Sequence, residues 1–304
     1  MERRGPRTPV DPRQPAAAFV EEERTEDGRV VPVATLFLVN RECPWRCLMC
    51  DLWKSTTTET AAPGVIPEQI RAALARLPPL SRVKVYNAGS FFDPRAIPVA
   101  DLPEIARALH GRERVIVECH PALVSADVER FRDLLDGDLE VAMGLETVHP
   151  EVLPLLNKGM TLDDFRRAAD RLAAARVALR AFVLLGLPFL ARGESVSWAV
   201  RSADYAFDSG ATAVTIIPTR AGNGAMEALG AAGHFEPPTL DDLEDALAAG
   251  ISLRRGRVFA DLWDLETLRT CSRCFSARRE RLAAVNRDQA DRARVACDRC
   301  GEGV

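Results

Sequence analysis

The sequence predicts an α/β fold in which a parallel sheet curls into a partial (β/α)6 barrel, followed by a small C-terminal metal-binding module. Three observations predict it. Between residues 33 and 218, six short apolar segments alternate with helical segments, which is typical of parallel sheets with right-handed crossovers. Polar or glycine-containing sequences follow these segments, where barrels carry their functional residues. Two C-x2-C pairs lie within residues 271–300.

The elements follow from local patterns. Pro67 opens a helix with Ile70, Leu74 and Leu77 on one face, as expected for proline in a first turn. The expected strands are 33–39, 83–86, 115–118, 139–145, 177–185 and 212–218, and the expected helices are 67–77, 102–109, 126–135, 162–175 and 194–208. A further strand over 258–265, containing Trp263, is expected to dock the C-terminal module onto the barrel.

The chain divides into three expected parts. Residues 1–28 are rich in proline, arginine and glutamate and are expected to form a flexible arm. Residues 29–235 form the barrel, and residues 236–304 form the C-terminal module. The last 54 residues carry 12 arginines against 8 acidic residues, although the whole chain has a net charge of −4.

Composition excludes several classes of protein. A hydrophobic fraction of 47% can fill a core, and a charged fraction of 28% is ordinary. No apolar run approaches the roughly 20 residues of a membrane span, and the first residues lack the apolar region of a secretory signal. We therefore expect a cytoplasmic protein without a membrane partner. There, eight clustered cysteines favour metal binding over disulfides.

The barrel is organised around residues 41–50, which we name the cysteine loop. It follows the first expected strand and places Cys43, Cys47 and Cys50 in a C-x3-C-x2-C spacing. Thiolates are the usual ligands of a [4Fe–4S] cluster, and a full set needs four. Three would leave one iron open to a small molecule. The alternatives are a zinc half-site, which this spacing fits poorly, or three unrelated buried thiols.

The other strand ends carry candidate ligand-binding groups. Gly89 would allow close approach of a ligand to the backbone, although an ordinary turn is the alternative. Glu118 could accept hydrogen bonds from a ligand, or it could be a helix cap or surface charge. Arg180 lies in an apolar run and needs a partner, either Glu146 or a ligand carboxylate. The candidates are Asn87, Gly89 and Ser90 after the second strand, Glu118 after the third, Glu146 after the fourth and Arg180 within the fifth.

Three neighbouring residues have simpler expected roles. Cys119 is expected to be a small buried residue and not a metal ligand, because free cysteine is often buried. His120 is expected to be a structural polar residue. Lys158 could approach a carboxylate or remain a solvated surface charge.

The cysteine loop resembles the signature of the radical S-adenosylmethionine (SAM) family. In that family the open iron binds the amino and carboxylate groups of SAM, and an electron from the cluster cleaves SAM to give a 5′-deoxyadenosyl radical. The resemblance implies that the cluster is held by Cys43, Cys47 and Cys50. Met49 departs from the family pattern, which often has an aromatic residue near the adenine at that position.

The order of later motifs resembles one branch of this family. Glu-Cys-His-Pro at 118–121 is followed by Gly-Leu-Glu-Thr at 144–147, Leu-Asn-Lys-Gly at 156–159 and Leu-Gly-Leu-Pro at 185–188. Over residues 33–235 this succession is similar to the elongator, methylthiotransferase and coproporphyrinogen oxidase branch, and most of all to the radical SAM subunit of archaeosine synthase. It implies SAM as a partner, an electron donor such as a flavodoxin or ferredoxin, and SAM contacts from Asn87, Gly89, Ser90, Glu118, Glu146 and Arg180.

The C-terminal module carries four further cysteines. They form two C-x2-C pairs, Cys271 with Cys274 and Cys297 with Cys300. Four thiolates can complete a tetrahedral zinc site or hold a second [4Fe–4S] cluster; we expect zinc, with unliganded thiols as a further alternative. The helix expected at 277–291 carries four arginines, which either face solvent or contact phosphate groups.

The expected function is modification of a tRNA base by a radical SAM enzyme. One alternative is a radical SAM enzyme that modifies a peptide or small metabolite with an auxiliary cluster. The other is a metal-binding RNA adaptor without catalytic activity.

Overall fold

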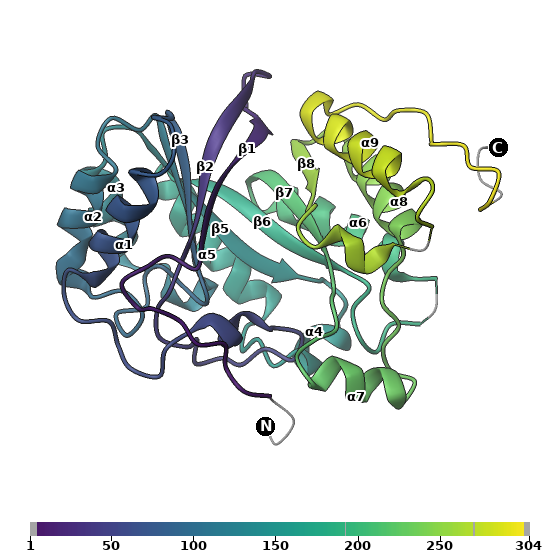
Figure 1. Ribbon diagram of the computed structural model, residues 1–304, viewed down its shortest axis with the longest axis horizontal. Helices are drawn as coiled ribbons and strands as arrows, with labels where there is room; N and C mark the ends of the chain where they lie inside the picture. Colours follow the sequence, from purple (N-terminus) through teal and green to yellow (C-terminus); the bar gives the residue numbers. More distant parts are fainter. Residues whose placement is uncertain (1–4, 192, 270, 301–304) are drawn as a thin grey trace.

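The computed structural model describes residues 5–191, 193–269 and 271–300 of the chain. Within these residues, eight strands form one sheet in sequence order, with β1 antiparallel to β2 and all later neighbours parallel. The sheet curls into a half-barrel (Figure 1). The strands are β1 (Ala17–Arg24), β2 (Val30–Leu38), β3 (Arg82–Asn87), β4 (Arg114–Glu118), β5 (Asp138–Glu146), β6 (Ala178–Leu185), β7 (Ala211–Pro218) and β8 (Arg257–Ala260). The predicted partial barrel is confirmed. β1 is added to the predicted strands, and β8 corresponds to the further strand expected over 258–265.

Most of the helices cover the outer face of the sheet, and α4 and α7 lie at its lower edge (Figure 1). They are α1 (Val65–Leu74), α2 (Leu102–Ala108), α3 (Ala126–Leu134), α4 (Val152–Leu155), α5 (Leu162–Ala174), α6 (Ser195–Asp208), α7 (Ala225–Ala231), α8 (Leu240–Ser252) and α9 (Phe275–Asp288). The start of α5 shows how local sequence sets these bounds. The Thr161 hydroxyl accepts the Asp164 N–H, and the Asp164 carboxylate accepts the Thr161 N–H, so two backbone donors at the helix start are satisfied.

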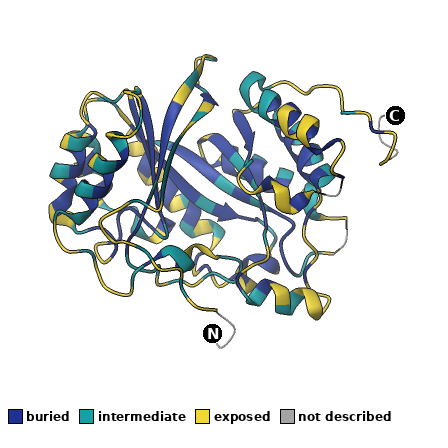
Figure 2. Cartoon of the chain, in the orientation of Figure 1, coloured by how far each residue is buried: buried dark blue, intermediate teal, exposed yellow. Residues whose placement is uncertain are grey.

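The sheet separates two apolar regions because side chains alternate between its faces. Figure 2 shows buried strands and helices whose exposed residues face outward. The main core lies between sheet and helices. A smaller cluster lines the concave inner face; it contains Tyr86, Ile116 and Ala142, with Phe37 and Phe182 packed against them. The inner face is therefore apolar and aromatic in its middle.

The expected flexible arm is wrong for residues 17–24, which form β1. This strand pairs with β2 from Ala17 opposite Phe37 to Arg24 opposite Val30. The prediction failed because the second half of β1 is a run of four charged residues, Glu21 to Arg24, which does not indicate a strand. Glu23 in this run is buried and paired inside the barrel.

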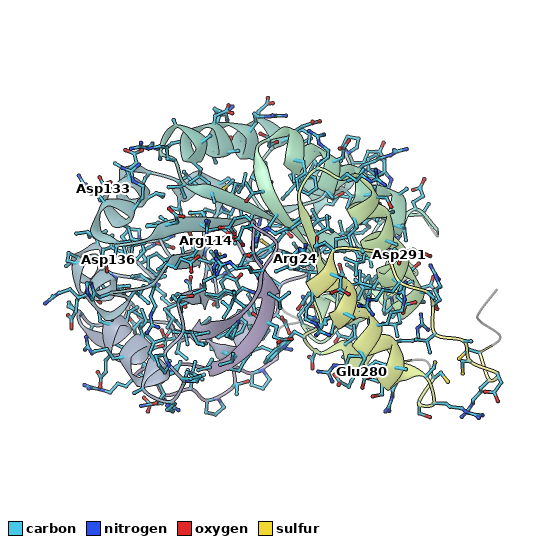
Figure 3. The ribbon with its side chains drawn as sticks, turned by 90° about the horizontal axis from the view of Figure 1, so that it is seen from above. Arg24, Arg114, Asp133, Asp136, Glu280 and Asp291 are labelled. Carbon is cyan, nitrogen blue, oxygen red and sulfur yellow. The ribbon has the colours of Figure 1, made fainter. Side chains whose placement is uncertain are left out.

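The interior near the start of the strands holds a buried ionic cluster. Arg180 Nε lies 2.6 Å from Glu140 Oε1, and Arg180 Nη2 lies 2.6 Å from Glu23 Oε1. Lys84 Nζ lies 2.6 Å from Glu23 Oε2. Burial alone would raise the pKa of Glu23, but Arg180 and Lys84 hold that pKa well below its usual range. Figure 3 views this end of the barrel and shows Arg114, which also pairs with Glu140, near its centre.

This cluster corrects the expectation for Arg180. The partners of Arg180 are Glu23 and Glu140, not Glu146 or a SAM carboxylate. Sequence reasoning missed both partners because Glu23 lay in the presumed arm and Glu140 in the expected strand 139–145.

The C-terminal module closes the free edges of the sheet. The side-chain amides of Asn286 on α9 and Gln289 just after it each pair with both backbone groups of one β8 residue, Ala260 and Val258 respectively. On the opposite edge, Arg24 Nη1 donates to the Arg287 carbonyl. The expected docking role holds for β8, although the strand ends at Ala260 and Trp263 lies beyond it. Among the described residues, none of the helices has both the length and the apolarity to cross a membrane.

Candidate functional site

The cysteine loop lies at the edge where the parallel strands end. Cys43, Cys47 and Cys50 line a cavity of about 880 Å³ together with Asn157 and Asn223. Asn157 follows α4 and Asn223 precedes α7, and both helices lie at the lower edge of the molecule in Figure 1. The structure therefore brings the three cysteines together around one open cavity, where the barrel rule predicts a functional site.

The loop backbone is held from two sides. Asn157 Nδ2 donates to the carbonyls of Trp45, at 2.9 Å, and Arg46, at 3.2 Å. From the other side, Asn223 Nδ2 donates to the carbonyls of Leu48, at 2.8 Å, and Cys50, at 3.2 Å. Each asparagine satisfies two loop carbonyls, so the path of the backbone between the cysteines is set before any metal binds.

An aromatic contact adds to this support. The Trp45 ring stacks on the His120 ring, with centroids 3.7 Å apart and planes 11° apart. A Cβ atom at Gly159 would lie 2.8 Å from Trp45 Cδ1, so only glycine leaves room for the tryptophan. His120 is buried and makes these contacts within the protein, which is consistent with the structural role expected for it.

The three thiols have raised pKa values. Burial raises the pKa of Cys43, that of Cys47 to about 11 and that of Cys50 to about 12, and the positive charge of Lys158 opposes the shift at Cys43 and Cys47. Metal ligation requires thiolates, so binding at this loop would release protons.

The ends of β3 and β4 supply polar groups beside the cysteines. Gly89 has φ +142°, and a Cβ atom there would lie 3.1 Å from Cys43 Cβ, so the turn packs directly on the first cysteine. The amide oxygen and nitrogen of Asn87 are buried without a hydrogen-bond partner among the described residues. Burial raises the pKa of Glu118 to about 8, although the Asn87 N–H and the positive charge of Lys158 both oppose the shift. These unsatisfied groups fit a polar, cationic ligand such as SAM.

Ser90 and Cys119 contact each other. The Ser90 hydroxyl donates to Cys119 Sγ at 3.5 Å and accepts the His120 N–H at 3.1 Å. Cys119 is buried, as expected, and burial raises the pKa of its thiol to about 12. Both contacts of the Ser90 hydroxyl lie within the protein, whereas its predicted role was to contact SAM.

Glu146 and Lys158 form a buried ion pair beside the loop. Lys158 Nζ lies 2.6 Å from Glu146 Oε1. Glu146 has φ +64° at a bulge in β5, and this conformation turns its carboxylate toward Lys158. The alternative of a solvated Lys158 is therefore wrong.

The four C-terminal cysteines gather into one compact group. The sulfur atoms of Cys271, Cys274, Cys297 and Cys300 all lie within 4.8 Å of one another. Backbone N–H groups of Cys274 and Arg273 lower the pKa of Cys271 to about 6, and those of Cys300 and Arg299 lower the pKa of Cys297. In each C-x2-C pair, backbone N–H groups thus stabilise the thiolate of the first cysteine, and the thiolate is the form that binds a metal.

Two of the four arginines of α9 differ from both expectations, whereas Arg279 is exposed and pairs with Glu266. Arg278 is buried and binds Glu244 and Asp241, and Arg281 is buried against Glu244 and Asp291. These two arginines neither face solvent nor present a phosphate-binding surface. They anchor α9 to α8.

A half-barrel with a three-cysteine loop at the ends of its strands defines a class of SAM-dependent iron–sulfur enzymes. The family model of the radical SAM superfamily matches residues 37–198, just over half of the chain. The chain belongs to this superfamily and is an enzyme, which disfavours the non-catalytic adaptor. A radical SAM domain implies a [4Fe–4S] cluster and SAM.

Similar proteins support a branch close to archaeosine synthase. The chain is 25% identical to archaeosine synthase subunit beta of Methanosarcina acetivorans over 249 residues, covering 76% of this chain and 70% of the relative. It is 28% identical to the subunit of that name in Thermococcus kodakarensis over 171 residues, covering 51% of each. An uncharacterised protein of Methanocaldococcus jannaschii is 23% identical, with coverages of 76% and 67%.

Solved structures show the same fold. Elp3 of Methanocaldococcus infernus aligns with a TM-score of 0.53 at 16% identity, covering 75% of this chain and 56% of that protein. A radical SAM methyltransferase from Sphaerobacter thermophilus aligns with a TM-score of 0.55 at 14% identity, covering 82% and 76%. The chain thus spans little more than half of the Elp3 structure. At these identities the likeness concerns the fold alone.

Proposed function

We propose that this radical SAM enzyme modifies a base of tRNA, with its cluster held by Cys43, Cys47 and Cys50. The observation that carries the cluster assignment is the loop itself: three cysteines line one cavity, and their backbone is hydrogen-bonded on both sides. The printed names of the relatives, archaeosine synthase subunit beta, support a tRNA substrate. A flavodoxin or ferredoxin is the proposed electron donor.

Residues next to the loop would hold SAM. When bound, the cluster supplies the electron for reductive cleavage of SAM. The unpartnered amide of Asn87 can donate to and accept from a polar ligand, and Gly89 keeps the backbone close to Cys43. Glu118 would ionise beside a cationic ligand, because an opposite charge lowers a carboxyl pKa that burial has raised. The protein thereby favours a ligand that carries both a cation and hydrogen-bonding groups.

The inner face of the barrel fits a flat aromatic substrate. Phe37 contacts Tyr86 edge-on, with centroids 5.9 Å apart, and Tyr86 contacts Phe182 at 6.1 Å. Trp263 is 52% exposed and stacks on Phe19 at 5.5 Å. Stacking of a nucleobase on an aromatic ring contributes roughly 1–3 kcal/mol. This surface favours a base over a peptide as substrate.

We further propose that the C-terminal cysteines bind a single zinc ion. Zinc–sulfur bonds of about 2.3 Å in a tetrahedron place the sulfurs about 3.8 Å apart. Here Cys271 Sγ and Cys297 Sγ are 4.0 Å apart, and Cys274 Sγ and Cys300 Sγ are 3.5 Å apart. A cluster would need wider spacing, because each cysteine binds a different iron. The observed spacing supports zinc over an auxiliary cluster.

Binding of bulk tRNA tests the substrate class. We expect a mobility shift that weakens steeply with salt, because binding to phosphates releases counterions. Trp263→Ala should weaken binding by at least fivefold, whereas Trp198→Ala on the outer helix α6 should leave it unchanged. No binding at about 50 mM salt, or equal loss in both variants, would favour a peptide or small metabolite as the substrate.

Metal analysis tests the zinc assignment. A variant with Cys43, Cys47 and Cys50 all changed to alanine, purified and reconstituted without oxygen, should contain about one zinc per chain and almost no iron. Retention of about four irons with the visible absorbance of a cluster would show that the C-terminal site is an auxiliary cluster.

A further inference from the structure

We propose that Lys158 and Glu146 together set the reduction potential of the cluster on the cysteine loop. Lys158 would raise the potential through its positive charge, and Glu146 would limit that effect. The inference rests on the proposed cluster assignment to Cys43, Cys47 and Cys50, and it gives the buried pair a role beyond structural support.

The backbone of Lys158 is fastened beneath the loop. Two residues before Lys158, the Leu156 carbonyl accepts the Leu48 N–H at 2.9 Å, and Asn157, next to Lys158, donates to two loop carbonyls. The Lys158 carbonyl lies 3.0 Å from His120 Nε2, which must donate because a carbonyl only accepts. The His120 Nδ1 atom accepts the Ala122 N–H, so this neutral tautomer is consistent with both contacts. His120 also stacks on Trp45 within the loop.

The ammonium group of Lys158 is also fixed in place. The Lys158 side chain is 9% exposed, and its Nζ lies 2.6 Å from Glu146 Oε1. A Cβ atom at Gly144 would lie 2.2 Å from this oxygen and 2.6 Å from Nζ, so glycine is needed beneath the pair. Within the described part of the chain, Glu146 is the one recorded ion-pair partner of Lys158. Two backbone features thus accommodate this pair: the glycine at position 144 and the left-handed conformation of Glu146.

The pair lies beside the cysteines. The two residues before Lys158 bind the backbone of Leu48, Trp45 and Arg46, which places the pair against the loop on both sides of Cys47. Reduction of a [4Fe–4S] cluster adds one electron and therefore one negative charge. A nearby buried cation stabilises the reduced form, and a nearby anion destabilises it; burial protects both effects from screening by salt.

The two members of the pair should therefore act in opposite directions. At a fixed solution potential, Lys158→Met should lower the ratio of reduced to oxidised cluster at least tenfold, which is 59 mV for one electron. Glu146→Gln should raise that ratio. The double variant should lie between the two single variants, because both charges are then removed. A merely structural role predicts no such opposition of sign.

The experiment is a redox titration of the full-length, anaerobically reconstituted protein. Dithionite is the reductant, SAM is left out, and the electron paramagnetic resonance signal reports the reduced cluster. Arg171→Met, which removes an arginine paired with Glu129 on the outer helices, is the control and should leave the midpoint unchanged. Should Lys158→Met lose iron, Lys158→Arg replaces it, keeps the charge and should keep the wild-type midpoint while Glu146→Gln still raises it.

Opposite shifts for Lys158→Met and Glu146→Gln support the inference. Equal midpoints, or shifts of the same sign, overturn it while leaving the cluster assignment intact. If the wild-type protein forms no cluster that depends on Cys47, the proposed function itself fails, and the two failures are thus distinguishable.

Discussion

Replacement of Glu118 by glutamine should stabilise the folded protein at alkaline pH and have little effect at acidic pH. Burial raises the pKa of Glu118 from its ordinary 4.5 to about 8. Between these two values the native protein binds more protons than the unfolded chain, so the free energy of unfolding falls as pH rises. Glutamine has nearly the same shape and cannot ionise, so the variant escapes this loss.

The magnitude follows from the shift. At about 1.4 kcal/mol per pH unit, the limiting difference between protonated and ionised Glu118 is about 5 kcal/mol. The side chain keeps some contact with solvent, which reduces the penalty. From pH 5 to pH 8 we therefore expect Glu118→Gln to gain about 3 kcal/mol in unfolding free energy relative to wild type.

Urea unfolding at pH 5, 6, 7 and 8 would measure this difference on reconstituted protein kept free of oxygen and of SAM. Glu151→Gln is the control, because Glu151 is exposed and the chemical change is the same. A difference that does not grow with pH, or that grows equally in the control, would refute the conclusion that burial keeps Glu118 protonated.

Three further variants test individual residues. Cys119→Ser should keep the iron content and SAM cleavage within a factor of two, and loss of a whole cluster would make Cys119 a ligand. Arg180→Met should lower the unfolding free energy measured in urea by about 3 kcal/mol, because it removes a buried cation that pairs with Glu23 and Glu140. The variant should keep its SAM affinity. A large loss of SAM affinity in the folded variant would indicate that Arg180 contacts SAM after all. Asn223→Ala should lower iron retention during gel filtration, since two carbonyls of the cysteine loop lose their donor; full retention would make this support dispensable.

The order of the strands could be predicted because each is a short apolar run followed by a polar turn. β1 could not, because half of its side chains are charged and their partners lie on distant strands. Glu23 meets Lys84 from β3 and Arg180 from β6 inside the barrel. A pattern read along the chain does not reveal such pairs.

The candidate site was predictable only where its residues lie together in one segment of the chain. The spacing of Cys43, Cys47 and Cys50 lies in one segment, so the sequence displays it directly. Asn223 holds the same loop from 173 residues beyond Cys50, and no local motif marks it. Lys158 stood in a recognised motif, but only the fold shows its pairing with Glu146 beneath the loop.

The most direct test of the central proposal measures 5′-deoxyadenosine. Protein reconstituted without oxygen, then given dithionite and SAM, should release this product. Cys47→Ala should release none, because loss of one thiolate removes an iron ligand from the loop, whereas Cys119→Ser should release nearly as much as wild type. Undiminished release from Cys47→Ala would contradict the assignment of the cluster to Cys43, Cys47 and Cys50.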